Sequence, residues 1–160
     1  MTHQMSREQS PLLPLTGTAP GYTQALALIP ESAALARCSV RTTLACWGLE
    51  ELADSAQVIA SELVTNAVLH GRPATATAEE PGWCRLTVER PAVGVVWVTV
   101  ADSSPRPPVQ RAAAPEAETG RGLTVIEGLA ARLTVRMERN GKSIQAELTL
   151  RDLSSVFPGG

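Results

Sequence analysis

The spacing of apolar and polar residues divides the chain into predicted strands and helices. Residues 22–29 (YTQALALI) alternate with the period of two that is typical of a half-buried strand. Residues 30–48 follow a helical pattern, opened by Pro30 and closed by Gly48. A second helix is predicted over residues 50–69, because its apolar positions recur at the helical period of about 3.6 residues. These positions are Leu52, Ala56, Ile59, Ala60, Leu63, Val64, Ala67 and Val68.

The second half of the chain is predicted to contain four strands and one helix. Residues 84–90 and 93–102 are predicted strands, and the second segment is rich in Val and includes Trp97, residue types that favour strand over helix. The Asn140-Gly141 dipeptide lies between two further strand-like segments, LTVRMER and KSIQAELTL, and is typical of a β-hairpin turn. A helix is predicted to begin near Gly122. The segment before it holds four prolines, so it is predicted to be a long loop, either a functional lid or disordered.

The order of the predicted elements is strand, helix, helix, two strands, loop, helix, two strands. Strands and helices segregated in this way favour an α+β fold, a two-layer sandwich of one mostly antiparallel sheet with helices on one face. Residues 22–152 would form a single domain. Residues 1–21 are expected to be a disordered tail and residues 153–160 a flexible end.

Composition and charge exclude several classes of protein. A formal net charge of -2 argues against a general binder of nucleic acid or of membrane surfaces. No apolar run approaches the roughly 20 residues that span a bilayer, and the first residues are polar, so a cytoplasmic location is expected. Three cysteines without a CxxC pair fit neither a disulfide framework nor a zinc site, and buried thiols are expected.

The second predicted helix carries Glu62, Asn66 and His70 at steps of four residues. Residues four apart on a helix are neighbours, and Asn is unfavourable in the middle of a helix because its amide competes with the backbone. An Asn oxygen can complete a Mg²⁺ shell that phosphates share, and a neighbouring Glu can accept a proton from a hydroxyl or water. Alternatively, the three side chains form the solvated edge of the helix.

Two further positions are candidates for binding. Asp102 ends an apolar strand, where a partly buried carboxylate needs hydrogen-bond donors such as the exocyclic amine of adenine. It could instead initiate a turn. Residues 120–122 (Gly-Arg-Gly) precede the last predicted helix, where backbone amides and the helix start suit phosphate, and Arg121 could add a charged contact. A flexible loop exit is the alternative there.

Taken in order, these motifs resemble the histidine-kinase-like ATPase superfamily over about residues 22–151. Residues 61–71 (SELVTNAVLHG), 102–108 (Asp-Ser-Ser-Pro-Arg-Pro-Pro) and 120–130 (GRGLTVIEGLA) are similar to segments of its small stand-alone bacterial members, the anti-sigma-factor serine kinase group of regulatory ATP-binding proteins. The resemblance implies a Bergerat-type ATP-binding fold with ATP and Mg²⁺ as cofactors. The superfamily's D-x-G-x-G box reads Asp-Ser-Ser-Pro-Arg in this chain, which lacks both glycines and puts nucleotide affinity in question.

The resemblance also implies a role for each matching position. Glu62 would be the catalytic base, and Asn66 would ligate the Mg²⁺ that bridges the ATP phosphates. Residues 103–119 would form the lid. The other nucleotide-binding positions would be Asp102 at the adenine amine, Gly120, Arg121 and Gly122 at the phosphates, Ser143 at the adenine through water, and His70, which fits the group's pattern.

Two functions follow from this resemblance. The first is a serine/threonine kinase that phosphorylates an anti-sigma-factor antagonist and controls a sigma factor. The second is a non-catalytic module that binds a protein partner in response to nucleotide. A structural α+β domain without nucleotide is a third reading. The resemblance implies a homodimer, because relatives commonly form one. Direct contact with nucleic acid or membrane is not expected.

Overall fold

The structure, a computed structural model, describes residues 20–104 and 118–150, with side chains described from residue 124 in the second range. All predicted helices and strands appear in the predicted order within these ranges. The elements are β1 (Gly21–Ala27), α2 (Ser32–Cys46), the 3-10 turn η1 (Glu50–Leu52), α3 (Ala53–His70), β2 (Trp83–Ala92), β3 (Val95–Asp102), α4 (Glu118–Leu129), β4 (Arg132–Glu138) and β5 (Gly141–Thr149).

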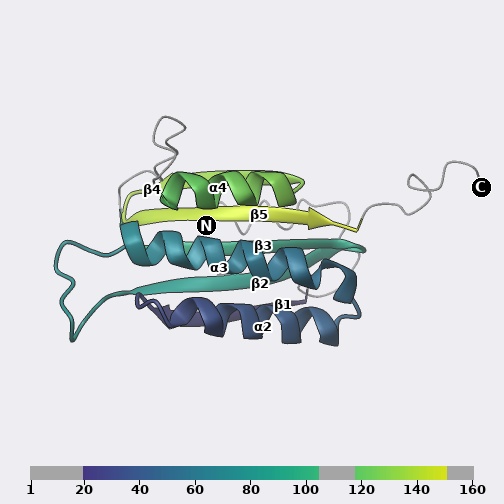
Figure 1. The fold of residues 1–160 in the computed structure, drawn as a ribbon, viewed down its shortest axis with the longest axis horizontal. Helices are drawn as coiled ribbons and strands as arrows, with labels where there is room; N and C mark the ends of the chain where they lie inside the picture. Colours follow the sequence, from purple (N-terminus) through teal and green to yellow (C-terminus); the bar gives the residue numbers. More distant parts are fainter. Residues whose placement is uncertain (1–19, 105–117, 151–160) are drawn as a thin grey trace, which may run out of the picture.

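The five strands form one sheet in the order β1-β2-β3-β5-β4, and every neighbouring pair is antiparallel. The three helices α2, α3 and α4 form a single layer over one face of this sheet (Figure 1). This arrangement confirms the predicted two-layer α+β sandwich. None of the described helices is both long and apolar enough to cross a bilayer.

The core lies between the helical layer and the sheet. On β3, Val96, Val98 and Val100 are buried, as their period of two places them on one face of the strand. They meet α3, whose apolar stripe is buried at Ile59 and Leu63. Fully burying each such side chain contributes about 1.5–3 kcal/mol, so the sheet and α3 hold each other in place.

Several boundaries differ from the predictions. β1 ends at Ala27, because the next backbone amide, that of Leu28, donates to the carbonyl of Gly82 outside the strand ladder. The second helix begins with a 3-10 turn. α4 begins at Glu118, so residues 120–122 lie inside its first turns and do not precede it. Glycines near a helix start carry little information about where the first turn begins, which explains the difference.

Other predictions meet the structure only in part. The predicted tail is described only at Pro20 and Gly21, and Gly21 already belongs to β1. The predicted lid is described only at its two ends, and the expected flexible C-terminal end lies outside the described residues. The expectation of buried thiols is confirmed for Cys84 but wrong for Cys38 and Cys46, which are exposed on α2.

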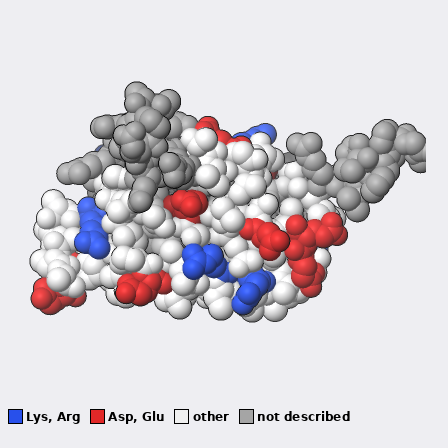
Figure 2. Space-filling view, viewed as in Figure 1, with Lys and Arg blue, Asp and Glu red and all other residues white. Residues whose placement is uncertain are grey.

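Charge is mixed on the helical side of the molecule. Figure 2 shows basic and acidic side chains interspersed on this side, with acidic ones gathered at the right-hand end. In the chain this end is where α2 leads into α3, and it includes the exposed side chains of Glu50, Glu51 and Asp54. The C-terminus of α3, the end of β3 and the start of β5 meet at the opposite end (Figure 1).

Candidate functional site

Asp102, the last residue of β3, forms a buried ion pair with Lys142 of β5. Lys142 Nζ lies 3.0 Å from Asp102 Oδ2 and 3.2 Å from Oδ1. The side chains of Lys142 and Asp102 are 0% and 4% exposed, respectively. The pairing of the strands explains the contact, because Asp102 and Lys142 are direct partners in the antiparallel ladder and point to the same face of the sheet.

Two backbone segments complete the surroundings of the Asp102 carboxylate. The backbone amide of Ser104 donates to Asp102 Oδ1 at 2.8 Å, the turn geometry that the sequence predicted as one alternative. On the other side, Gly71 ends α3. A Cβ atom at Gly71 would lie 2.7 Å from Asp102 Oδ2 and 2.6 Å from the carbonyl oxygen of Ala67. Only glycine therefore permits α3 to approach Asp102 this closely.

Ser143 lies one residue away from the β5 position that reaches Asp102. Successive side chains of a strand point to opposite faces, and Ser143 pairs with Ala101, not with Asp102. Ser143 therefore lies on the face of the sheet opposite to the helices, away from its predicted place. Lys142 is the residue that sequence reasoning missed, because its position after Asn140-Gly141 suggested only a hairpin turn. Side chains two residues apart on a strand share a face of the sheet. Counting back two residues from the apolar Ile144, which is buried, would have placed Lys142 on the buried face.

Asn66 is the most unusual side chain of α3. It is 5% exposed, and neither its Oδ1 nor its Nδ2 has a hydrogen-bond partner among the described residues. This excludes the solvated helix edge as an explanation for Asn66. Buried polar groups are normally hydrogen-bonded, so an amide without a partner points to a ligand that supplies one.

Glu62, Asn66 and His70 form a polar line along α3, and Glu62 and His70 are less buried than Asn66. Glu62 lies one helical turn before Asn66 and is half-buried, which places the two side chains next to each other. His70, also half-buried, is the last residue of α3 and immediately precedes Gly71. The line that begins at Glu62 thus runs along α3 toward Asp102.

Gly120, Arg121 and Gly122 lie in the first turns of α4, and α4 packs beside α3. Their backbone is helical, and the side chain of Arg121 lies outside the described atoms. α3, β3 and the start of α4 are therefore the elements that carry the predicted positions, whereas Ser143 lies on the other face of the sheet.

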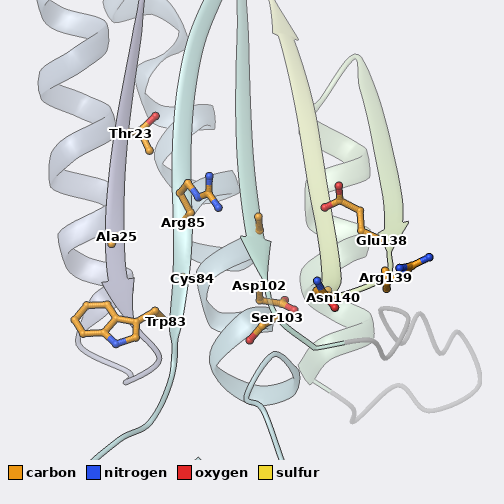
Figure 3. Close-up of a pocket in the computed structure, with 12 residues that line it drawn as sticks. Thr23, Ala25, Trp83, Cys84, Arg85, Asp102, Ser103, Glu138, Arg139 and Asn140 are labelled. Atoms are coloured by element: carbon orange, nitrogen blue, oxygen red, sulfur yellow. The ribbon is translucent and has the colours of Figure 1, made fainter. Parts of the chain in front are cut away.

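A hollow of about 650 Å³ opens at the same end of the sheet, but on its open face. Thr23, Ala25, Trp83 and Arg85 line it from β1 and β2, and the turn at Asn140 closes it (Figure 3). These strand residues point away from the helices by the pleat of the sheet. The hollow touches Asp102 at the rim and includes neither Glu62 nor Asn66, so it is distinct from the polar line on α3.

The residues on α3 fit a magnesium ion held together with phosphates. Among the described residues, no three His, Cys, Asp or Glu side chains gather as a metal site. A Mg²⁺ ion shared with phosphates needs only one or two protein ligands and keeps several waters. The buried Asn66 amide, which no described residue hydrogen-bonds, offers such an oxygen.

The negative charge of Asp102 also affects the pKa of the nearby Cys84 thiol. Burial, and next the negative charge of Asp102, raise the pKa of the Cys84 thiol to about 11 from an ordinary value of 9.0. Above pH 9.0 the unfolded chain loses this proton while the folded chain keeps it, so stability is fully present below pH 9.0 and falls as pH rises toward about 11. The expected slope reaches about 1.4 kcal/mol per pH unit.

Urea unfolding across this pH window measures the effect, with Cys84→Ala as the comparison. The variant should lack the part of the slope that Cys84 contributes, while the exposed Cys38 and Cys46 remain in both proteins as matched thiols. An identical pH dependence for the two proteins would contradict the raised pKa.

Comparison with known proteins identifies the family. Residues 26–148 match the family described as the histidine kinase-like ATPase domain. The RsbU and RsbW domains of Rv1364c from Mycobacterium tuberculosis superpose with a TM-score of 0.57 at 20% identity. That match covers 83% of this chain and 33% of the other, so the chain spans about a third of the length of that protein.

A second solved structure has a similar fold. A chain of the SiaB-SiaC complex from Pseudomonas aeruginosa superposes with a TM-score of 0.54 at 15% identity, and the match covers 92% of this chain and 95% of that one. No curated protein shows a significant match. At these identities the solved structures support the fold alone, whereas the family match extends over most of the chain, from β1 to β5. The chain therefore belongs to the histidine kinase-like ATPase domain family.

Proposed function

We propose that this protein is an ATP-binding regulator that transfers the γ-phosphate of ATP to a serine or threonine of an anti-sigma-factor antagonist. The observation that carries the proposal is the Asn66 amide, which is buried on α3, has no hydrogen-bond partner in the described part of the chain, and lies one turn from Glu62. An amide oxygen can ligate the Mg²⁺ that phosphoryl transfer uses, and a neighbouring carboxylate can accept the proton of the attacking hydroxyl.

Each residue has a chemical task in this proposal. Asn66 would hold Mg²⁺, which neutralises charge on the ATP phosphates, and Asp102 would accept a hydrogen bond from the adenine amine. Glu62 would accept the proton of the attacking hydroxyl. The hydroxyl oxygen bonds to the γ-phosphorus while the bond to the β–γ bridging oxygen breaks, and ADP leaves. The first turns of α4, with Gly120, Arg121 and Gly122, would meet the phosphates.

The partners are part of the proposal. One of the similar structures is a complex of two proteins, SiaB and SiaC, and by analogy we propose a protein antagonist as the substrate. Release from that antagonist would allow the protein to bind a sigma factor. A homodimer and a cytoplasmic location complete the proposal. His70 near the nucleotide and residues 103–119 as the lid complete the proposed site, whereas Ser143, on the other face of the sheet, no longer belongs to it.

A non-catalytic module is the second candidate. Its support is the segment from Asp102 to Arg106, which lacks the two family glycines, together with the ion pair that already engages Asp102. In this version ATP or ADP orders the lid and thereby selects a protein partner, with no phosphate transferred.

Glu62→Gln separates the two functions. We expect the variant to retain Mg-ATP binding, seen as a thermal shift, and to lose phosphate transfer by about 10²–10⁴-fold, because only the proton acceptor has changed. At 100 times its dissociation constant, ATP should stabilise both proteins by about 2.7 kcal/mol. The measurement uses radiolabelled ATP and the anti-sigma-factor antagonist encoded nearest to the gene.

Glu51→Gln is the matched control, since Glu51 is an exposed glutamate at the start of the same helical segment. It should leave transfer unchanged. Mg-ATP binding without transfer by the unaltered protein would favour the non-catalytic module, and the absence of any thermal shift would contradict both candidates.

A further inference from the structure

The ammonium of Lys142 is enclosed in the protein. Its side chain is 0% exposed, and among the described residues its only hydrogen-bonding contacts are the two oxygens of Asp102. A buried lysine is rare and is tolerated when its charge and its three N–H groups are satisfied. Two oxygens account for two of these N–H groups, which leaves a third donor to be satisfied.

The Asp102 carboxylate has a matching free acceptor position. Its two oxygens offer about four lone-pair sites. Oδ1 accepts from the Ser104 amide and from Lys142 Nζ, whereas the one described donor close to Oδ2 is its ion-pair partner, Lys142 Nζ. A charged donor and a charged acceptor thus lie side by side, with Nζ and Oδ2 separated by 3.0 Å.

We propose that Lys142 is a base-specificity residue that reads the adenine ring together with Asp102. The adenine edge presents a donor, the exocyclic amine at N6, next to an acceptor, ring nitrogen N1. Asp102 would accept from N6 while Lys142 donates to N1. This inference rests on the proposed nucleotide site, and it adds a second, charged contact to the base.

The pair of Asp102 and Lys142 would also select against 6-oxopurines. A 6-oxopurine such as hypoxanthine carries an acceptor at O6 and a donor at N1, so the polarity of its edge is reversed. In the same position O6 would face the carboxylate and N1–H the ammonium. A site that hydrogen-bonds one pattern rejects the opposite pattern strongly, because buried groups on both sides lose their partners.

Three nucleotides test the assignment on the unaltered protein by calorimetry in the presence of Mg²⁺. 1-Deaza-ATP lacks only the N1 acceptor and should bind about 10- to 100-fold more weakly than ATP, the loss expected for one hydrogen bond to a charged group. ITP, with the reversed edge, should bind about 100-fold more weakly or worse. In Lys142→Met, ATP and 1-deaza-ATP should bind with equal affinity.

Arg85→Met is the matched control. Arg85 lies on β2 at the same end of the sheet but points into the open-face hollow, so its removal should leave the preference for ATP over 1-deaza-ATP intact. If Lys142→Met does not fold, the nucleotide series on the unaltered protein still decides the proposal.

Equal binding of ATP and 1-deaza-ATP by the unaltered protein would overturn the role of Lys142 and leave the proposed ATP site standing. ITP binding as tightly as ATP, or more tightly, would overturn it too. If none of the three nucleotides binds, the proposed function and this inference fall together.

Discussion

Replacing Asp102 with Asn is expected to lower the free energy of unfolding by about 3–5 kcal/mol and to abolish binding of adenine nucleotides. The side chain keeps its shape and loses its charge, so Lys142 remains as a buried ammonium without a counter-charge. The variant also replaces the carboxylate of the proposed adenine contact with a neutral amide, which accepts a weaker hydrogen bond and can turn its NH2 group toward the adenine amine. Both losses arise from the same change.

A double-mutant cycle measures this coupling. Urea unfolding of Asp102→Asn, Lys142→Met and the combined variant should give a double variant that is more stable than the sum of the single losses predicts. Replacing a whole buried pair with neutral groups is often close to neutral, whereas removing one partner is costly. Additive losses, or a cost below about 1 kcal/mol for Asp102→Asn, would contradict the buried ion pair.

Asn66→Ala is expected to stabilise the protein without nucleotide by about 1–2 kcal/mol while it abolishes the thermal shift caused by Mg-ATP. The buried Asn66 amide has no hydrogen-bond partner within residues 20–104 and 118–150, which is a cost to folding, and Ala is the better helix former, so both terms favour the variant. Loss of the amide oxygen removes the proposed Mg²⁺ ligand. A gain in stability with a loss of ligand binding is characteristic of a residue kept for function.

Thr65→Ala on the same helix is the control for helix propensity, because Thr65 is a half-buried neighbour outside the polar line. It should retain the response to Mg-ATP. A variant Asn66→Ala that is less stable than the parent would show that the amide has partners in the folded protein. A retained Mg-ATP response would remove Asn66 from the proposed site.

The sequence predicted the elements well where a local pattern was strong. The valine alternation of β3 and the Asn140-Gly141 turn each depend on neighbouring residues only, and both are confirmed. The predicted ends of helices and strands were less accurate, as the start of α4 shows. Glycines near a helix start carry little information about where the first turn begins.

In the candidate site too, the sequence predicted what depends on a local pattern and missed what depends on distant residues. Asn66 stood out in the sequence because an amide in the middle of a helix competes with the backbone, and the structure shows that this side chain is buried. Lys142 did not stand out, since a lysine beside a hairpin turn is normally exposed. Its burial depends on Asp102, 40 residues earlier in the chain, which supplies the counter-charge.

By itself, the sequence determined the helices, the strands, the α+β class and the line of polar residues on α3, because each follows from spacing within one segment. The tertiary structure alone decided that Lys142, and not Ser143, reaches Asp102, and that Gly71 brings α3 against that carboxylate. Strand register has a period of two, so one residue changes the face of the sheet. That register is set by pairing between segments distant in the chain.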